Sequence, residues 1–179
     1  MRRICVFAGS STGAIGAYAQ AAAHFGKEIA RRDVALVFGG GRLGLMGAMA
    51  DAAMAAGGEV IGVMPRALVE RERAHPGITR LETVADMHER KALMNELSDA
   101  FVALPGGIGT LEELFEVYSW VQLGFHHKPV AILDVRGFFG PLLGCLDALV
   151  EQGFVGREAR GLLIRETDPA RLLDHLFDT

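Results

Sequence analysis

The stretch Leu104-Pro-Gly-Gly-Ile-Gly-Thr-Leu-Glu-Glu113 joins an apolar run to an amphipathic segment. The preceding run, Asp99 to Leu104, is typical of a buried strand, and Leu111 to Leu123 has the periodicity of a helix. Glycines at three of four consecutive positions let a ligand approach the backbone N–H groups, and a helix start offers donors that suit a phosphate. The sequence therefore predicts a strand, an anion-binding turn and a helix.

Two side chains add chemistry to this turn. Thr110 supplies a hydroxyl at the helix start, and Glu113 lies about one turn further in, where its carboxylate can face a ligand held by the turn. Glycine-rich turns between strands and helices are common, however, and a glutamate in a first turn can be only a favourable partner of the helix dipole. The order of proline, glycines, threonine and acids favours a ligand site.

The same order of strand, turn and helix recurs along the chain. Besides the strand and helix described above, apolar runs and helical periodicity predict strands at Ile4–Ala8, Val34–Phe38, Val60–Met64, Leu81–Val84, Pro129–Asp134 and Leu162–Arg165, and helices at Tyr18–Arg32, Leu45–Ala56, Asp86–Leu97, Phe138–Gln152 and from Pro169, with Asp168 as its N-cap. This alternation predicts an α/β fold, namely a doubly wound parallel sheet between helix layers, with the glycine loops at the carboxyl ends of the strands. Residues 1–179 are expected to form a single domain.

Composition excludes several classes of function. A net charge of −4 gives no general attraction for nucleic acid or an anionic membrane. Cys5 and Cys145 are far apart and are expected to be ordinary apolar residues, while His126 and His127 lack a third ligand and are expected at the surface, so we predict no metal site and no cofactor. The apolar part of the first ten residues is too short for a signal peptide, and no stretch resembles a membrane span. We therefore expect a cytoplasmic protein.

A second glycine loop, Gly39-Gly-Gly-Arg-Leu-Gly-Leu-Met-Gly47, contains a G-x-G-x-x-G pattern. It follows the second strand rather than the first, and the next strand ends in Met64-Pro65 without the acid that would hold the ribose of NAD. The loop can still approach a nucleotide closely. Alternatively, Gly44 and Gly47 only let the following helix pack on the sheet.

The helix at Asp86–Leu97 carries the chain's adjacent Arg90 and Lys91. Asp86 is a plausible N-cap with Glu89 three residues on. Neighbours on a helix diverge by about 100°, so at least one of the two cations is expected over a pocket, although a lysine stem can also lie along the core edge.

Two loops complete the pattern. Ser10, Ser11 and Thr12 can cap the next helix, which is the favoured role, or touch a ligand. The polar segment Ala67–Arg80 is expected to be a surface excursion whose charge run, Glu70 to Arg73, is solvated.

Together these features indicate a site for a nucleoside 5′-monophosphate. The chain has one good phosphate turn and no G-K-[ST] lysine, which disfavours a triphosphate. If the phosphate binds at Gly106 to Thr110, Glu113 lies near the ribose, where a carboxylate can stabilise an oxocarbenium-like sugar and activate water. Arg90 could hold that carboxylate ionised or grip the ribose and phosphate. The predicted reaction is hydrolysis of an N-glycosidic bond.

Over nearly its whole length the sequence resembles the LOG (Lonely guy) family, cytokinin riboside 5′-monophosphate phosphoribohydrolases that were long labelled lysine decarboxylases. The resemblance rests on Phe7-Ala-Gly-Ser-Ser11, Gly39-Gly-Gly41, Met64-Pro-Arg66, Met87-His-Glu-Arg-Lys91, Pro105-Gly-Gly-Ile-Gly-Thr-Leu-Glu-Glu113 and Trp120-Val-Gln-Leu-Gly124. It implies a Rossmann-like fold in three α/β/α layers, a homodimer with the site near the subunit interface, and Arg90 and Glu113 as the catalytic pair. Plant members carry a contact glutamate where this chain has Ala67, so that contact is left unassigned.

The predicted substrate-binding set extends this pair. It comprises Ser10, Gly39, Gly40, Gly41, Met64, Lys91, Gly106, Gly107, Ile108, Gly109, Thr110, Leu111, Glu112 and Ser119. Within it, the resemblance gives Lys91 and the turn Gly107 to Thr110 contacts with the nucleotide, and places Ser119 where some members have a ligand-touching threonine.

Alternatives remain at this stage. A non-catalytic carrier of a nucleotide or of the molybdenum cofactor is the second interpretation, since such carriers resemble this superfamily in fold, and an NAD-dependent oxidoreductase is a distant third. The sequence does not distinguish AMP from a prenylated cytokinin nucleotide. Met46, Met64, Met87 or Met94 could line a pocket for a prenyl tail, or could simply belong to the core.

Overall fold

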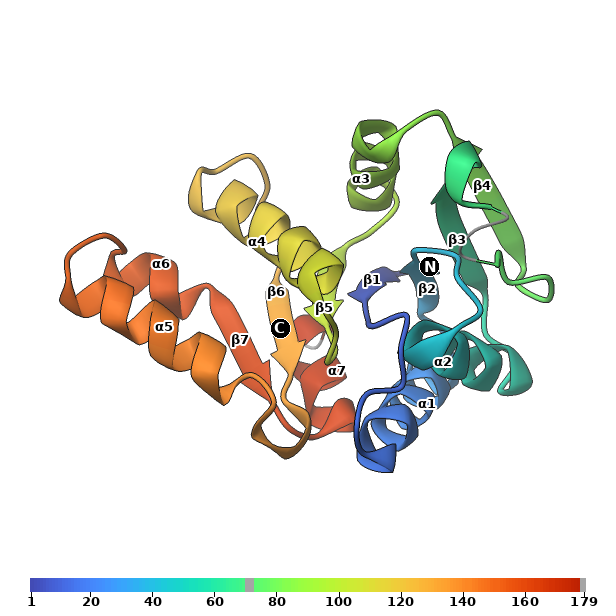
Figure 1. Cartoon of the computed structure of the whole chain (residues 1–179), viewed down its shortest axis with the longest axis horizontal. Coiled ribbons are helices and arrows are strands. Elements are labelled where there is room, and N and C mark those ends of the chain that lie inside the picture. The colour runs from blue at the N-terminus through green and yellow to red at the C-terminus, as the bar shows by residue number, and fades with distance from the viewer. Residues whose placement is uncertain (70–72, 178–179) are drawn as a thin grey trace.

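The computed structural model describes residues 1–69 and 73–177. Its strands are β1 Arg3–Phe7, β2 Ala35–Phe38, β3 Val60–Pro65, β4 Arg80–Val84, β5 Ala100–Ala103, β6 Val130–Leu133 and β7 Leu163–Glu166. Its helices are α1 Gly16–Arg31, α2 Gly44–Ala55, α3 Met87–Glu96, α4 Ile108–Gln122, α5 Gly140–Glu151, α6 Arg157–Gly161 and α7 Pro169–Phe177, with short 3-10 helices η1 Arg66–Leu68 and η2 Val135–Gly137. Figure 1 shows this alternation.

The strands form one parallel sheet in the order β4-β3-β2-β1-β5-β6-β7. From β1 the chain winds outward to β4, returns to the other side of β1 as β5, and then winds outward in the opposite direction. The reversal between β1 and β5 is a topological switch point, and ligands of open α/β sheets bind at the carboxyl ends of the strands at such a point. The loops after β1 and β5 both reach this position.

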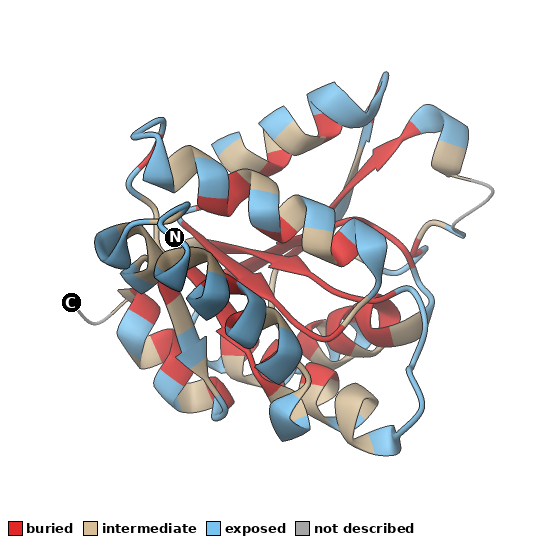
Figure 2. Ribbon diagram, turned by 60° about the vertical axis from the view of Figure 1, so that its left-hand side comes forward, coloured by how far each residue is buried: buried red, intermediate tan, exposed pale blue. Residues whose placement is uncertain are grey.

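Helices pack on both faces of the sheet, so its central strands are buried on both sides. On one face, side chains of α1, α2 and α7 pack against residues such as Val6 and Phe38. On the other face, side chains of α3, α4 and α5 pack against residues such as Phe7 and Phe101. Figure 1 shows α3 and α4 on one side of the sheet and α1 and α2 on the other, and Figure 2 shows the buried strands between the outward, exposed faces of the helices. The predicted three-layer fold is confirmed.

Most of the predicted helix signals are confirmed. The carboxylate of Asp86 accepts bonds from the backbone N–H groups of His88 and Glu89, and Glu89 in turn accepts from Ala85 N. The two bonds to Asp86 satisfy donors that a helix start leaves without an intrahelical partner, and the bond to Glu89 holds the residue that precedes the cap. Asp168 caps α7 in the same way by accepting from Arg171 N.

Some local predictions are wrong. The loop residues Ser10 to Thr12 do not cap α1, which starts at Gly16, and the Ser11 hydroxyl accepts from Gly13 N instead. The short helix α6 was not predicted, because five residues carry too little periodicity to be seen in the sequence.

Several expected surface or core assignments also change. His126 is buried, not at the surface: its Nε2–H donates to Val117 O at 3.0 Å and its Nδ1 accepts from Lys128 N at 3.2 Å. Cys5 is buried as expected, but Cys145 is exposed on α5. Of the predicted charge run, Glu70 to Glu72 lie outside the described residues. Across residues 1–69 and 73–177, no helix reaches the length and apolar character that a membrane crossing requires.

Candidate functional site

Gly9 links the loops that meet at the switch point. Its N–H donates to Pro105 O in the loop after β5, at 3.1 Å, and its carbonyl accepts from Leu45 N at 2.9 Å at the start of α2. A side chain at this position would meet the backbone of Gly106 and Pro105 at 3.2–3.3 Å. The three loops are therefore held together by backbone contacts of a single residue.

The open turn, residues 105–110, starts α4. Gly107 is the N-cap residue, and the first helical bond runs from Leu111 N to Gly107 O. The N–H groups before Leu111 are therefore the donors that a helix start leaves without intrahelical partners. Gly106 instead allows close packing, since a Cβ there would lie 2.1 Å from the Thr110 hydroxyl. The turn thus combines a close-packed base with accessible amides.

The closed turn, residues 39–47, starts α2 and is occupied by protein. The carbonyl of Gly9 accepts from Leu45 N and, at 3.4 Å, from Met46 N, which are donors at the start of this helix. Gly44 has φ +64°, and a Cβ on it would lie 2.2 Å from the backbone carbon of Ser10. Gly44 therefore has a packing role, but it packs against the loop after β1 and not against the sheet as considered, and a Cβ on Gly47 would lie 1.9 Å from Arg42 O in the same turn. The G-x-G-x-x-G pattern does not present an open anion site.

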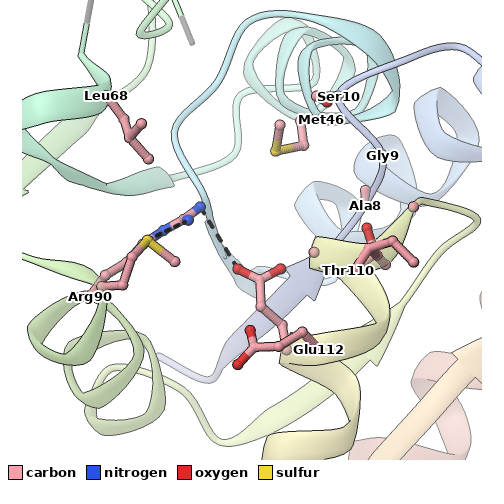
Figure 3. A pocket seen from close by; sticks show the side chains of 13 residues that line it. Ala8, Gly9, Ser10, Met46, Leu68, Arg90, Thr110 and Glu112 are labelled. Atoms are coloured by element: carbon pink, nitrogen blue, oxygen red, sulfur yellow. Dashed lines mark hydrogen bonds and ion pairs between the residues drawn. The ribbon is translucent and has the colours of Figure 1, made fainter. Parts of the chain in front are cut away.

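A cavity of about 340 Å³ opens beside the open turn. It is lined by Ala8, Gly9, Ser10, Met46, Leu68, Met87, Arg90, Gly107, Ile108, Gly109, Thr110, Glu112 and Glu113. Figure 3 shows Arg90 on one wall, Thr110 and Glu112 on α4 opposite it, and Met46 and Leu68 above. The volume lies in the range of small-molecule sites, which are mostly apolar with a few convergent polar groups.

Arg90 and Glu113, predicted as the catalytic pair, face the same cavity. Arg90 Nη2 lies 3.8 Å from Glu113 Oε1, and both side chains are largely buried, at 8% and 13% exposed. Arg90 Nε donates to Val63 O at 3.1 Å, and Nη2 donates weakly to Gly39 O at 3.4 Å. Because these carbonyls hold the guanidinium, its position does not depend on Glu113 alone.

Gly39 makes room for this arginine. A Cβ built on Gly39 would lie 2.2 Å from Arg90 Nη2, which is far inside van der Waals contact. The sequence predicted that Gly39 contacts the nucleotide, whereas the structure places it directly beneath the guanidinium.

Lys91 does not line the cavity. Its Nζ bonds Glu112 Oε1 at 2.8 Å and Glu116 Oε1 at 2.9 Å on α4. These hydrogen bonds, first that to Glu112, raise the pKa of Lys91 above its ordinary value, so the ammonium stays charged at neutral pH. The predicted divergence of Arg90 and Lys91 is confirmed, with Arg90 as the residue over the pocket.

The structure divides the predicted substrate-binding set into two groups. Ser10, Gly107, Ile108, Gly109, Thr110 and Glu112 line the cavity with the catalytic pair, whereas Gly39, Gly40, Gly41, Met64, Lys91, Gly106, Leu111 and Ser119 do not. Gly40 instead accepts from His75 N, Gly41 bridges to Ala74, and Ser119 is exposed near the end of α4.

Leu68 is a lining residue that sequence reasoning missed. It lies on η1 within a segment predicted to be a surface excursion, yet it reaches over the cavity (Figure 3). The Met64-Pro-Arg66 motif directly before it is the signal that could have indicated it. Of the four methionines considered for an apolar pocket, Met46 and Met87 line the cavity, while Met64 and Met94 belong to the core.

The donor set limits the chemistry of this site. Within the described residues, no group of three or more His, Cys, Asp or Glu side chains is arranged to hold a metal ion. The described residues lining the cavity include no lysine, so they offer no amine for the Schiff base that pyridoxal phosphate chemistry needs. They offer backbone amides, the hydroxyls of Ser10 and Thr110, one guanidinium and two carboxylates.

The fold and the cavity define a Rossmann-like α/β protein with a ligand site at the switch point of its sheet. A family model described as "Possible lysine decarboxylase" matches residues 46–176. The chain belongs to this family, the LOG family.

Curated relatives cover almost all of the chain. It is similar to the probable cytokinin riboside 5′-monophosphate phosphoribohydrolase LOGL2 of Oryza sativa subsp. japonica, with 48% identity over 98% of this chain and 72% of the relative. It is also similar to the cytokinin riboside 5′-monophosphate phosphoribohydrolase LOG1 of Arabidopsis thaliana, with 47% identity over 99% of this chain and 83% of the relative.

Solved structures share the fold at lower identity. The molybdenum cofactor carrier protein of Chlamydomonas reinhardtii has a TM-score of 0.72 and 23% identity, covering 99% of both chains. The molybdenum cofactor binding protein of Rippkaea orientalis has a TM-score of 0.73 and 19% identity, covering 99% of this chain and 96% of its own. At these identities the likeness shows the fold alone.

Proposed function

We propose that this chain hydrolyses the N-glycosidic bond of a nucleoside 5′-monophosphate, either AMP or an N6-substituted cytokinin riboside monophosphate, to the free base and ribose 5-phosphate. The observation that carries the proposal is the arrangement of Arg90 and Glu113 on opposite walls of one cavity that also contains the open turn. Relatives at 47–48% identity are named for this reaction on cytokinin nucleotides.

The open turn supplies the phosphate end of the site. The amides of Ile108, Gly109 and Thr110 lie at the start of α4, where aligned peptide dipoles favour an anion. Gly107 and Gly109 leave open space where a side chain would stand. Because the cavity also holds two carboxylates, these local donors rather than net charge must attract the phosphate.

Arg90 and Glu113 act on the sugar. With the phosphate on the open turn, the carboxylate of Glu113 orients a water molecule and takes its proton as the oxygen attacks C1′. The C1′–N bond breaks, its electron pair leaves with the base, and the base takes up one proton. Positive charge that develops on the ribose is stabilised by the carboxylate, as in glycoside hydrolysis. Arg90, whose Nη2 lies 3.8 Å from Glu113 Oε1, pairs with this carboxylate and can bind ribose or phosphate oxygens.

The apolar wall receives the base. Met46, Leu68 and Met87 line the cavity together, and thioether and aliphatic side chains suit a flat purine or an added alkyl group. This wall supports both AMP and a prenylated nucleotide as substrates.

Replacement of Glu113 tests the reaction. Glu113→Gln keeps the shape of the side chain but removes the carboxylate that acts as general base. We therefore expect turnover to fall by a factor on the order of 10³ while nucleotide binding is retained. Released base is quantified by chromatography, and nucleotide affinity is measured by calorimetry. Glu151→Gln, at the far end of α5, is the matched control.

The outcomes separate the enzyme from a carrier. If the parent binds AMP and isopentenyladenosine monophosphate without releasing base, the chain is a nucleotide carrier. If Glu113→Gln hydrolyses AMP as fast as the parent, Glu113 is not the general base. The ratio of kcat/KM for the two substrates decides between AMP and the prenylated nucleotide.

The proposal includes a homodimer, as in the family. Large apolar side chains are exposed just beyond α4, at Leu123 (62%) and Phe125 (74%), and just beyond α5, at Phe154 (81%). Sedimentation of the parent and of Phe125→Ser is the test, and a parent that sediments as a monomer at micromolar concentration contradicts it.

A further inference from the structure

Lys91 joins the two helices that carry the catalytic pair. It lies on α3 directly after Arg90, and its partners Glu112 and Glu116 lie on α4 on either side of Glu113 in sequence. The two glutamates are four residues apart, so they occupy one face of α4 and can hold one ammonium between them. Because the side chain of Lys91 is only 16% exposed, solvent screens these ionic contacts less than it would at an open surface.

Apolar packing does not fill the space beneath this contact. A small cavity of about 10 Å³ lies between α3 and α4, lined by Phe7, Lys91, Met94, Asn95, Phe101, Glu113, Glu116 and Val117. Lys91 and Glu116 both line this gap, so their ionic contact joins α3 to α4 beside Glu113. The ionic contacts of Lys91 therefore bear on the helix spacing at this level.

We propose that Lys91 is a positioning residue that fixes the spacing between α3 and α4, and thereby the separation of Arg90 from Glu113. We call the three-residue contact of Lys91, Glu112 and Glu116 the lysine clamp. This inference rests on the proposed function, and it replaces the nucleotide contact that the sequence suggested for Lys91.

The geometry favours positioning over ligand contact. Lys91 is absent from the described lining of the large cavity, and its ammonium already has two carboxylate partners within 2.9 Å. A phosphate on the open turn would have to compete with both of them. Misplacement of a catalytic group by about 1 Å can cost about 100-fold in rate, so a modest change in helix spacing is sufficient to be measured.

Kinetics of clamp variants test the inference. For Lys91→Met we expect kcat to fall about tenfold while KM changes less than about threefold, because the catalytic geometry changes and the phosphate turn does not. Lys91→Arg, which can still bridge the two carboxylates, should recover most of the loss. Lys27→Met, an exposed lysine on α1, is the control, and melting temperatures of all variants separate misfolding from misplacement.

Glu116 provides the distinguishing measurement, because it is not in the described lining of the large cavity. Glu116→Gln should lower kcat in the same direction, and the double variant with Lys91→Met should be no worse than Lys91→Met alone, since both changes break one contact. A rise in KM with unchanged kcat for Lys91→Met, or additive effects of the two changes, would overturn the clamp.

The parent is assayed first, so that failure of the proposed function is seen separately. If the parent releases no base, crystal structures of the parent and of Lys91→Met decide the matter. An unchanged distance between Arg90 and Glu113 in the two structures would then overturn the inference.

Discussion

The open turn and the closed turn are both glycine-rich connections between a strand and a helix, yet only one of them is available to a ligand. The start of α2 is covered by the carbonyl of Gly9, whereas the start of α4 lines a cavity of about 340 Å³. The pattern of glycines therefore does not identify an anion site. A helix start can bind an anion only if no other part of the chain already accepts hydrogen bonds from its backbone N–H groups.

The closed turn contributes to the site indirectly. Gly39, at its beginning, leaves the space in which the guanidinium of Arg90 lies, and its carbonyl accepts from that guanidinium. One turn is thus proposed to bind the substrate while the other seats a catalytic residue. Four substitutions of glycine or histidine test whether the two turns have these different roles.

The largest effect is expected for Gly39→Ala. The added methyl group would lie 2.2 Å from Arg90 Nη2, so the arginine must move, and we expect kcat/KM to fall about 100-fold. The change acts through Arg90 only if it adds no further loss in an Arg90→Ala background. Additive losses in steady-state kinetics would show that Gly39 has a separate role.

Gly44→Ala should damage the fold rather than the chemistry. Its positive φ and the close backbone of Ser10 predict a loss of roughly 2–3 kcal/mol in the free energy of unfolding, measured by urea denaturation. An alanine variant of normal stability would contradict the packing role of the closed turn.

Gly109→Ala is expected to weaken binding without loss of stability. A methyl group there meets nothing within 4 Å and would intrude on the edge of the cavity, so KM should rise about tenfold with an unchanged melting temperature. Gly144→Ala on α5 also meets nothing within 4 Å and is the matched control. Equal kinetics for both variants would place the phosphate elsewhere.

The smallest effect concerns His126, which supports the strand and helix on either side of the open turn. It donates to Val117 on α4, and its ring lies 5.4 Å from that of Phe101 on β5. Burial lowers the pKa of His126 below its ordinary value of 6.5. As the pH falls below about 6.5, the unfolded chain therefore binds a proton that the folded chain does not, and stability decreases.

Unfolding curves between pH 7.5 and 5.5 measure this dependence. His126→Gln should lose part of the decrease, while His127→Gln, at the exposed neighbouring position, should keep it. Identical pH dependence in the parent and His126→Gln would exclude the coupling.

The sequence was sufficient to predict the sheet and the placement of the open turn. The five central strands β1, β2, β3, β5 and β6 are buried and appear in the sequence as continuous apolar runs, and the edge strands β4 and β7 were predicted from shorter apolar segments. The helix starts at Asp86 and Asp168 were predicted because a carboxylate cap is a local signal.

The remaining features depend on contacts between distant segments. That Arg90 rather than Lys91 faces the cavity follows from where Glu112 and Glu116 lie across the gap between helices, which no local pattern contains. The burial of His126 likewise depends on Val117 and Lys128 around it. Leu68 was missed because a short 3-10 helix in a polar segment gives no periodic signal.

The backbone bonds of Gly9 have a kinetic consequence. Since they already fasten the loops after β1 and β5 to the start of α2, the phosphate end of the cleft needs no ordering step when a nucleotide arrives. Association should then follow a single exponential whose rate rises linearly with nucleotide concentration, without the plateau that a slow closing motion imposes.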